Sequence, residues 1–252
     1  MSVAVAVPVY RPALEPDEEV SLRHLRAHLG RYDTYLVAPE GLGLPLDLPA
    51  KRFAFASHRD YSDLLLSAAF YEAFAGYDHL LVHQLDCLVL SDELDAWCER
   101  GFDYVGAPWV RRGPDGRPCF AGVGNGGLSL RRVETFLRVL ELAARPFERV
   151  RLAATQAAAA ARRFAVRLPR VRTAARAALG ARYRYEDKFW SNEAPRLLPE
   201  FRIPRAEVAV AFAFETEPRF CLEQNGGRLP FGVHRWAFHD RGLWEPYLLP
   251  PG

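Results

Sequence analysis

The stretch HLLVHQLDCLVL, residues 79–90, decides the fold class of this chain. Its apolar run is too short to span a membrane, and Asp86 lies near its far end with Asp92 just beyond. A continuous apolar run of this length is typical of a strand buried on both faces of a parallel sheet. In open α/β sheets, ligands bind at the carboxyl ends of such strands. Asp86 is therefore a candidate functional carboxylate, although an acid at this point could also cap the turn that ends the strand.

The segments around this stretch alternate between strand-like and helix-like patterns through the first hundred or so residues. Alternation of this kind predicts an α/β fold, with a mostly parallel, Rossmann-like sheet flanked by helices. The regular alternation ends at a glycine-rich loop at 122–127, which a short strand at 128–130 follows. We expect strands at 3–9, 34–38, 78–85, 103–107 and 208–215, and helices at 17–29, 62–75, 91–100, 131–144 and 187–198.

The composition is that of a globular protein of 252 residues, half of them hydrophobic and a quarter charged. No apolar run reaches the roughly 18 residues of a membrane span, so we expect no transmembrane helix. The first ten residues, MSVAVAVPVY, are typical of a strand and lack the basic start of a signal peptide. The four cysteines have no CxxC spacing and are expected to be reduced thiols. We therefore expect a cytoplasmic protein with a single domain over 1–252.

The net charge of +2 conceals a strongly basic segment. Residues 149–185 contain ten arginines and no acid, which leaves 23 basic against 31 acidic residues elsewhere, a charge of about −8. We expect a basic helical insertion here, and its role has several alternatives. It could be a solvated helical hairpin, or it could bind an acidic acceptor or dock on an anionic membrane surface at the inner face of the membrane. Nucleic-acid binding is the least supported role, because few aromatic side chains are available for stacking.

Four places combine polar side chains with unusual backbone. The first is the QLD segment at 84–86, and the second is GNGG at 124–127, where small residues let a ligand approach the backbone, although such clusters often only form turns. The acids in YEDKFW (185–190) could simply favour a helix start, or one could be a partly desolvated base. In LPFGVHRW (229–236), His234 could line a pocket or pack in the core. The sequence has no nucleophile elbow, P-loop or HExxH pattern, which argues against hydrolase and kinase functions.

These places occur in an order that resembles the DUF5672 family. That family is similar in turn to GT-A glycosyltransferases, which share a DxD motif, a glycine-rich acceptor loop, an xED motif and a C-terminal histidine, in this order. The resemblance implies a GT-A-like fold and a hexosyltransferase-type enzyme that uses a nucleotide-sugar donor and a glycan or other hydroxyl acceptor. It covers nearly the whole chain except the basic segment, and it rests on VPVY (7–10), QLD (84–86), GAPW (106–109), VGNGGLSLR (123–131), EDKFW (186–190) and LPFGVHRW (229–236).

The resemblance also implies roles for individual residues. Asp187, next to Glu186, would be the general base of the xED motif, and a single base opposite the leaving group favours inversion at the anomeric carbon. Asp86 would meet the donor diphosphate, and Asp86 and His234 are the candidate metal ligands. The implied donor-binding residues are Pro8, Val9, Tyr10, Arg11, Arg59, Gln84, Asp86 and His234, and the implied acceptor-binding residues are Trp109, Asn125, Gly126, Gly127 and Trp190.

One residue departs from the family's DxD pattern, because Gln84 stands where the first acid is expected. An amide oxygen can ligate a hard cation but adds no charge to hold one. We therefore expect either Mn²⁺ or Mg²⁺ at Asp86, or no metal and a diphosphate neutralised by Arg59, Arg111 or Arg235. Gln84 also favours an alternative of a different class, a catalytically inactive module that binds a nucleotide or glycan on the same scaffold.

Overall fold

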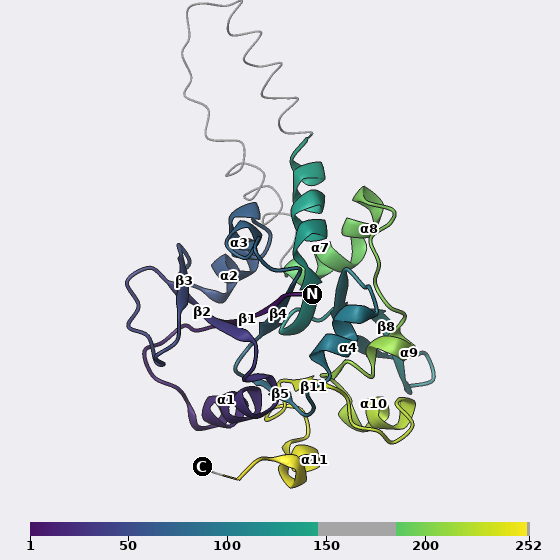
Figure 1. Ribbon diagram of the computed structural model, residues 1–252. Coiled ribbons are helices and arrows are strands. Elements are labelled where there is room, and N and C mark those ends of the chain that lie inside the picture. The colour runs from purple at the N-terminus through teal and green to yellow at the C-terminus, as the bar shows by residue number, and fades with distance from the viewer. Residues whose placement is uncertain (146–184, 251–252) are drawn as a thin grey trace, which may run out of the picture.

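A central sheet of six strands organises the computed structural model, which describes residues 1–145 and 185–250 (Figure 1). The strand order is β3-β2-β1-β4-β9-β6, and β9 is the strand that runs antiparallel to its two neighbours. Helices flank the sheet (Figure 1), so the expected α/β fold with a mostly parallel sheet is confirmed. The six strands are β1 (Val3–Pro8), β2 (Asp33–Pro39), β3 (Ala50–Phe53), β4 (His79–His83), β6 (Tyr104–Gly106) and β9 (Leu128–Arg132).

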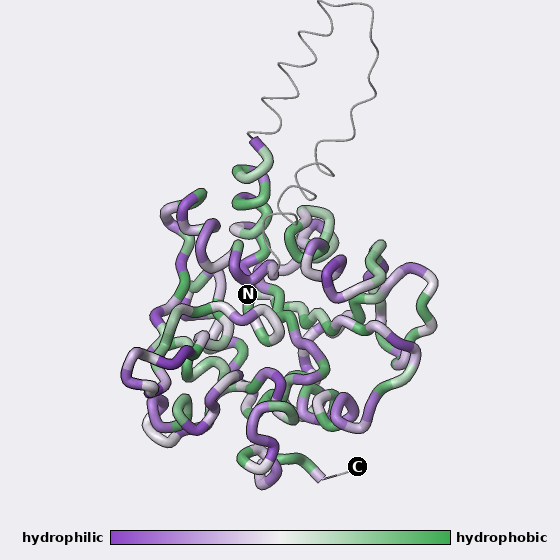
Figure 2. The backbone as a smooth tube through the Cα atoms, turned by 180° about the vertical axis from the view of Figure 1, so that it is seen from behind, coloured by the Kyte–Doolittle hydropathy of each residue, from purple (hydrophilic) through white to green (hydrophobic). Residues whose placement is uncertain are grey.

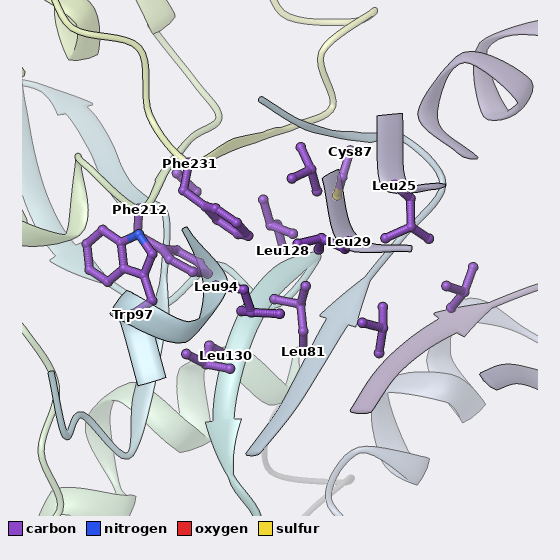
Figure 3. Close-up of a cluster of buried hydrophobic side chains, with 14 of the residues drawn as sticks. Leu25, Leu29, Leu81, Cys87, Leu94, Trp97, Leu128, Leu130, Phe212 and Phe231 are labelled. Atoms are coloured by element: carbon purple, nitrogen blue, oxygen red, sulfur yellow. The ribbon is translucent and has the colours of Figure 1, made fainter. Parts of the chain in front are cut away.

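The first face of the sheet packs against helices α1 (Pro16–Leu29) and α4 (Leu94–Glu99). Because side chains alternate along a strand, Val5 and Val7 of β1 point to this face and join one hydrophobic cluster. Figure 3 shows leucines of α1 and Trp97 of α4 within this cluster. Helix α1 begins at a proline with acidic residues in its first turn, which explains why its position is predictable from the sequence.

The second face of the sheet packs against α2 (His58–Leu64), α3 (Ala68–Glu72) and a helix that covers 133–145. Ala4 and Ala6 of β1 point to this face, and their small side chains leave room for the aromatic residues of the helices. Much of the chain near the central strands is green, hence hydrophobic, in Figure 2. The prediction of a single helix at 62–75 is wrong. Two helices, α2 and α3, form instead, and each begins with its own serine cap.

The stretch 79–90 forms two strands instead of the expected one. Strand β4 ends at His83, and after a turn at 84–86 the chain continues as β5 (Cys87–Val89) in a separate three-stranded sheet. The turn forms because the amide of Gln84 donates to the carbonyl of Gly127, while the amide of Cys87 donates to the carbonyl of Gln84. Asp86 therefore lies in a turn at the carboxyl end of β4. The other strands of this sheet are β10 (Ala213–Phe214) and β11 (Gly232–His234).

The chain leaves the central sheet after residue 106. The GAPW proline begins β7 (Pro108–Arg112), which pairs with β8 (Pro118–Val123) in a separate hairpin. A proline is tolerated there because the first residue of a strand need not donate to a partner. The expected strand at 208–215 is reduced to its last part, β10 (Ala213–Phe214), because the end of α9 and a turn occupy 208–212. The remaining helices are α7 (Glu186–Asn192), α8 (Ala194–Leu197), α9 (Ala206–Ala209), α10 (Pro218–Gln224) and α11 (Arg241–Trp244), with a 3₁₀ helix at Glu245–Tyr247.

The expected basic helical insertion at 149–185 lies outside the described residues, except for Tyr185. Its suggested roles in binding an acidic acceptor or a membrane surface therefore stay predictions. Within the described ranges, no helix has both the length and the apolar character needed to cross a membrane.

Candidate active site

A cleft of about 930 Å³ opens at the carboxyl ends of β1 and β4. Its walls come from the loop after β1, the turn at 84–86, the loop before β9, the start of α7 and the end of β11. Because β9 is antiparallel, the loop that precedes it reaches the same edge as the loops that follow the parallel strands. The expected site residues that line the cleft are Pro8, Tyr10, Arg11, Gln84, Asp86, Trp109, Asn125, Gly126, Gly127, Glu186, Asp187 and His234.

His234 is the buried cationic group of the cleft. Its Nε2 atom lies 3.3 Å from Oε1 of Gln84 and 3.4 Å from Oδ1 of Asp86, and its Nδ1 atom lies 3.1 Å from Oε1 of Glu215. Burial opposes a charge on the ring, but the two carboxylates outweigh it and raise the pKa of His234 to about 9. The protonated imidazole in turn lowers the pKa of Asp86, against the effect of burial. His234 is therefore an imidazolium at neutral pH.

The glycine-rich loop fits closely around this histidine. A Cβ atom at Gly127 would overlap the ring of His234, so no other residue can occupy this position with the ring in place. The amide of Gly127 donates to Oδ1 of Asn125 at 3.0 Å, and Nδ2 of Asn125 donates to Oε2 of Glu215 at 2.8 Å. The loop is thus shaped by side-chain hydrogen bonds as well as by its glycines.

Gly127→Ala is expected to push the His234 ring out of its position. A displacement of this kind should destabilise the fold by about 1–3 kcal/mol, which urea denaturation measures. Gly242→Ala is the matched control, because a Cβ at that position has no atom within 4 Å. Equal behaviour of the two variants would contradict the close fit.

Glu186 is expected to act in catalysis, but its side chain is buried in an ion pair. Its Oε1 atom accepts from Nη2 of Arg131 at 2.8 Å, and the guanidinium also donates to the hydroxyl of Tyr71 and to Oγ of Ser129. Burial disfavours the charge of Arg131, yet the ion pair holds the pKa of Arg131 well above its ordinary value. The backbone amide of Glu186 donates to Oγ of Ser62. These contacts fix the first turn of α7 and engage Glu186 fully.

Asp187 is the acid of this pair whose chemistry is available. Burial, followed by the charge of Glu186, raises the pKa of Asp187 to about 7. Its Oδ1 atom is buried and has no hydrogen-bond partner within the described part of the chain. Lys188 lies beside it, with Nζ 3.1 Å from the centre of the Trp109 ring. A carboxylate that is partly desolvated and free on one oxygen has the properties of a general base near neutral pH.

Three expected binding residues, Val9, Trp190 and Arg59, are not among the residues that line the cleft. Val9 is 3% exposed and belongs to the hydrophobic cluster on the α1 face. Trp190 is fully buried, and its ring stacks on Phe136 with ring centroids 4.0 Å apart. Arg59 points along α2 and pairs with Asp63 at 3.4 Å. Among the alternative arginines for the diphosphate, Arg111 is exposed on the β7–β8 hairpin and Arg235 lines the cleft.

Glu215 and Lys188 are among the charged residues of the cleft that sequence reasoning missed. Glu215 directly follows β10, and no neighbouring motif marks it as functional. Lys188 lies inside the EDKFW motif, for which the sequence analysis assigns charged-group chemistry only to the acids. The signal that could have found Lys188 is its position one residue after the candidate base, in a helix whose first turn reaches the cleft.

The residues around His234 fit a hard divalent cation poorly. One atom each of Asp86, Cys87 and His234 lie within 4.8 Å of one another. Burial raises the pKa of the Cys87 thiol well above its ordinary value, so it is not a thiolate. On the Nε2 side of His234, which faces the cleft, the nearby oxygen donors are the carboxylate of Asp86 and the neutral amide of Gln84, whereas Mg²⁺ and Mn²⁺ prefer several oxygen ligands. We therefore derive no step through a metal ion.

Two solved structures are similar to this one at low sequence identity. A glycosyltransferase involved in the glycosylation of the major capsid of PBCV-1 matches with a TM-score of 0.48 and 10% identity, and the match covers 98% of each chain. The apo-form glycosyltransferase GlyE of Streptococcus pneumoniae TIGR4 matches with a TM-score of 0.44 and 15% identity, and the match covers all of this chain but 61% of that one.

No curated protein is significantly similar to the chain in sequence. One family model does match, and its description is "Protein of unknown function (DUF5672)". The match covers residues 47–234, which is most of the chain and includes the turn at 84–86, the glycine-rich loop, Asp187 and His234. The chain therefore belongs to the DUF5672 family.

Proposed function

We propose that this protein is a glycosyltransferase that moves a sugar from a nucleotide-sugar donor to a hydroxyl acceptor. The observation that carries the proposal is the pairing, in one cleft, of a base and a cationic group. Asp187 has a pKa of about 7 and a free oxygen, and His234 is an imidazolium on another wall. Sugar transfer needs a base for the attacking hydroxyl and a positive charge for the departing diphosphate.

The proposed reaction is a single displacement with inversion. The oxygen of the acceptor hydroxyl attacks the anomeric carbon of the sugar while Asp187 takes the hydroxyl proton. The bond between the anomeric carbon and the donor diphosphate breaks on the opposite side. His234 and Arg235 stabilise the negative charge that develops on the leaving group. Glu186 is held by Arg131, so its role in this reaction is to position Asp187.

Binding of free nucleotides tests the donor side of the proposal. UDP, GDP, CMP and dTDP, each with and without Mn²⁺, are added to the protein and the melting temperature is measured. A ligand at 100 times its Kd adds about 2.7 kcal/mol of stability, so one nucleotide should raise the melting temperature clearly above the others. A shift that requires Mn²⁺ would show that the site takes a metal after all. No shift with any nucleotide would contradict the proposed donor class.

Asp86→Ala is expected to lower transfer on the order of 10²- to 10³-fold, because Asp86 favours the protonated form of His234, the cation beside the leaving group. Donor hydrolysis, read as release of nucleoside diphosphate, measures this without a known acceptor. Asp47→Asn is the control, since Asp47 is exposed and lies outside the cleft. Turnover of Asp86→Ala at the wild-type rate would remove Asp86 from the site.

The neutral residue Gln84 favours a second candidate, a module that binds a nucleotide or glycan without catalysis. The same measurements separate the two functions. A nucleotide that raises the melting temperature while no nucleotide sugar is hydrolysed or transferred would support the binding module. Release of the nucleoside diphosphate that depends on Asp187 would support the transferase.

A further inference from the structure

Glu215 makes short contacts with two different walls of the cleft. One carboxylate oxygen, Oε2, accepts from Nδ2 of Asn125 at 2.8 Å, and the other, Oε1, lies 3.1 Å from Nδ1 of His234. The side chain is 11% exposed, so water screens these contacts little. The contact with Nδ1 is short but does not have hydrogen-bond geometry, so it is an electrostatic contact. Glu215 thus connects the glycine-rich loop with β11.

The contacts of Glu215 close a ring of neighbours. Gly127 donates its amide proton to Asn125, Asn125 donates to Glu215, Glu215 faces His234, and His234 packs on the α-carbon of Gly127. Each member fixes the next, and the Nε2 atom of His234 is left pointing to Gln84 and Asp86. A carboxylate on one ring nitrogen determines both the orientation of an imidazole and which nitrogen faces the reaction.

We propose that Glu215 is a positioning residue. It fixes the His234 ring relative to the Asn125 loop, so that Nε2 of His234 faces the donor. This inference rests on the proposed function for its kinetic consequences, but the contacts themselves do not depend on it. The role differs from that of a binding group, since Glu215 acts through His234 and Asn125. It also explains why an acid adjoins a histidine that must meet an anionic leaving group.

Glu215→Gln tests the role with little change in size. Its amide can accept from one partner, but its NH₂ group then faces the other, and both Asn125 and His234 present N–H groups. Adding Asn125→Asp in the same chain restores an acceptor opposite that NH₂ group and keeps the net charge of the pair. Glu223→Gln, at an exposed position of α10, is the matched control.

The first measurement is the ¹⁵N spectrum of the histidine rings in the full-length protein at one pH. The chain has seven histidines, so His234→Gln assigns the signal of interest. Glu215→Gln should shift the His234 ring signals, the double variant should return them toward the wild type, and Glu223→Gln should leave them in place. Unchanged ring signals in Glu215→Gln, or signals that the double variant does not restore, would overturn the inference.

The second measurement is donor turnover. Glu215→Gln should lower kcat by about 10- to 100-fold with a smaller change in KM, because the side chain orients a group that acts on the leaving diphosphate. The double variant should recover part of this loss. A loss confined to KM would contradict a positioning role. If the wild type turns over no nucleotide sugar, the proposed function fails, while the ring signals still decide the role of Glu215.

Discussion

Asp187→Asn is expected to abolish most of the transferase activity and at the same time to stabilise the protein. The side-chain amide of Asn cannot take the proton from the acceptor hydroxyl, and general bases contribute about 10²- to 10⁴-fold to rate. In the wild type, turnover should rise with pH through about 7, where the carboxyl group ionises. The variant should show neither this rate nor this pH dependence. Asp187→Asn turnover at the wild-type level would exclude Asp187 as the base.

The gain in stability follows from the raised pKa of Asp187. The folded protein holds the carboxyl proton up to about pH 7, whereas the unfolded chain releases it near pH 4, so the wild type loses stability as pH rises between these values. Asn carries no charge to bury. At pH 8 the variant should therefore gain a few kcal/mol, about 2–4, in free energy of unfolding, or roughly 5–10 °C in melting temperature.

The pH series gives this prediction its control. The gain of Asp187→Asn over the wild type should shrink as pH falls from 8 toward 4, because the wild-type side chain is then neutral in the fold as well. Asp47→Asn, on the surface, should give no comparable gain at any pH. A gain that stays constant with pH would show that burial of a charge is not its cause.

Arg131→Met is expected to cause the largest loss of stability. The substitution leaves the Glu186 carboxylate buried without its cation, and it also removes the donors to Tyr71 and Ser129. Removal of one partner from a buried ion pair typically costs about 3–5 kcal/mol. Urea denaturation should show a loss of this size. Activity should fall as well, because Nη2 of Arg131 also donates to the carbonyl of Gly126 in the floor of the cleft.

A second substitution separates the charge from the packing. Glu186→Gln added to Arg131→Met removes the unpaired charge, so the double variant should be more stable than Arg131→Met alone. Arg138→Met is the control for loss of a guanidinium, since Arg138 is 59% exposed and pairs with an exposed glutamate, and it should change stability by less than about 0.5 kcal/mol. If Arg131→Met costs no more than this control, the pair does not stabilise the fold.

The sequence predicts the parts of the fold that depend on local chemistry. The helix at Pro16–Leu29 is evident from its proline start, its acidic first turn and the glycine that follows it, and the first strand from its valine and alanine run. The break at 84–86 is not predictable in this way. It depends on the carbonyl of Gly127, about forty residues further along the chain, which accepts from the amide of Gln84.

The EDKFW motif shows the same limit of prediction from sequence within the site. The motif indicates a helix and an acid with altered chemistry, and it does not say which side of the helix faces the cleft. Glu186 and Trp190 are four residues apart, so they share one helix face, and that face packs on Arg131 and Phe136. Asp187 is on the adjacent face. The burial of Trp190 and the engagement of Glu186 therefore have a single cause, the rotation of α7 about its axis.

The reversed direction of β9 determines where the acceptor side could diversify. The hairpin β7–β8 leads into the loop before β9, so it projects from the rim of the cleft and not from the opposite end of the sheet. Insertions or deletions at its tip, near Pro114 and Asp115, would reshape the entrance while the buried strand kept its pairing. Under the proposed function, relatives of this chain would differ in the hydroxyl compounds that they accept through changes in one exposed hairpin, while Asp187 and His234 stay the same.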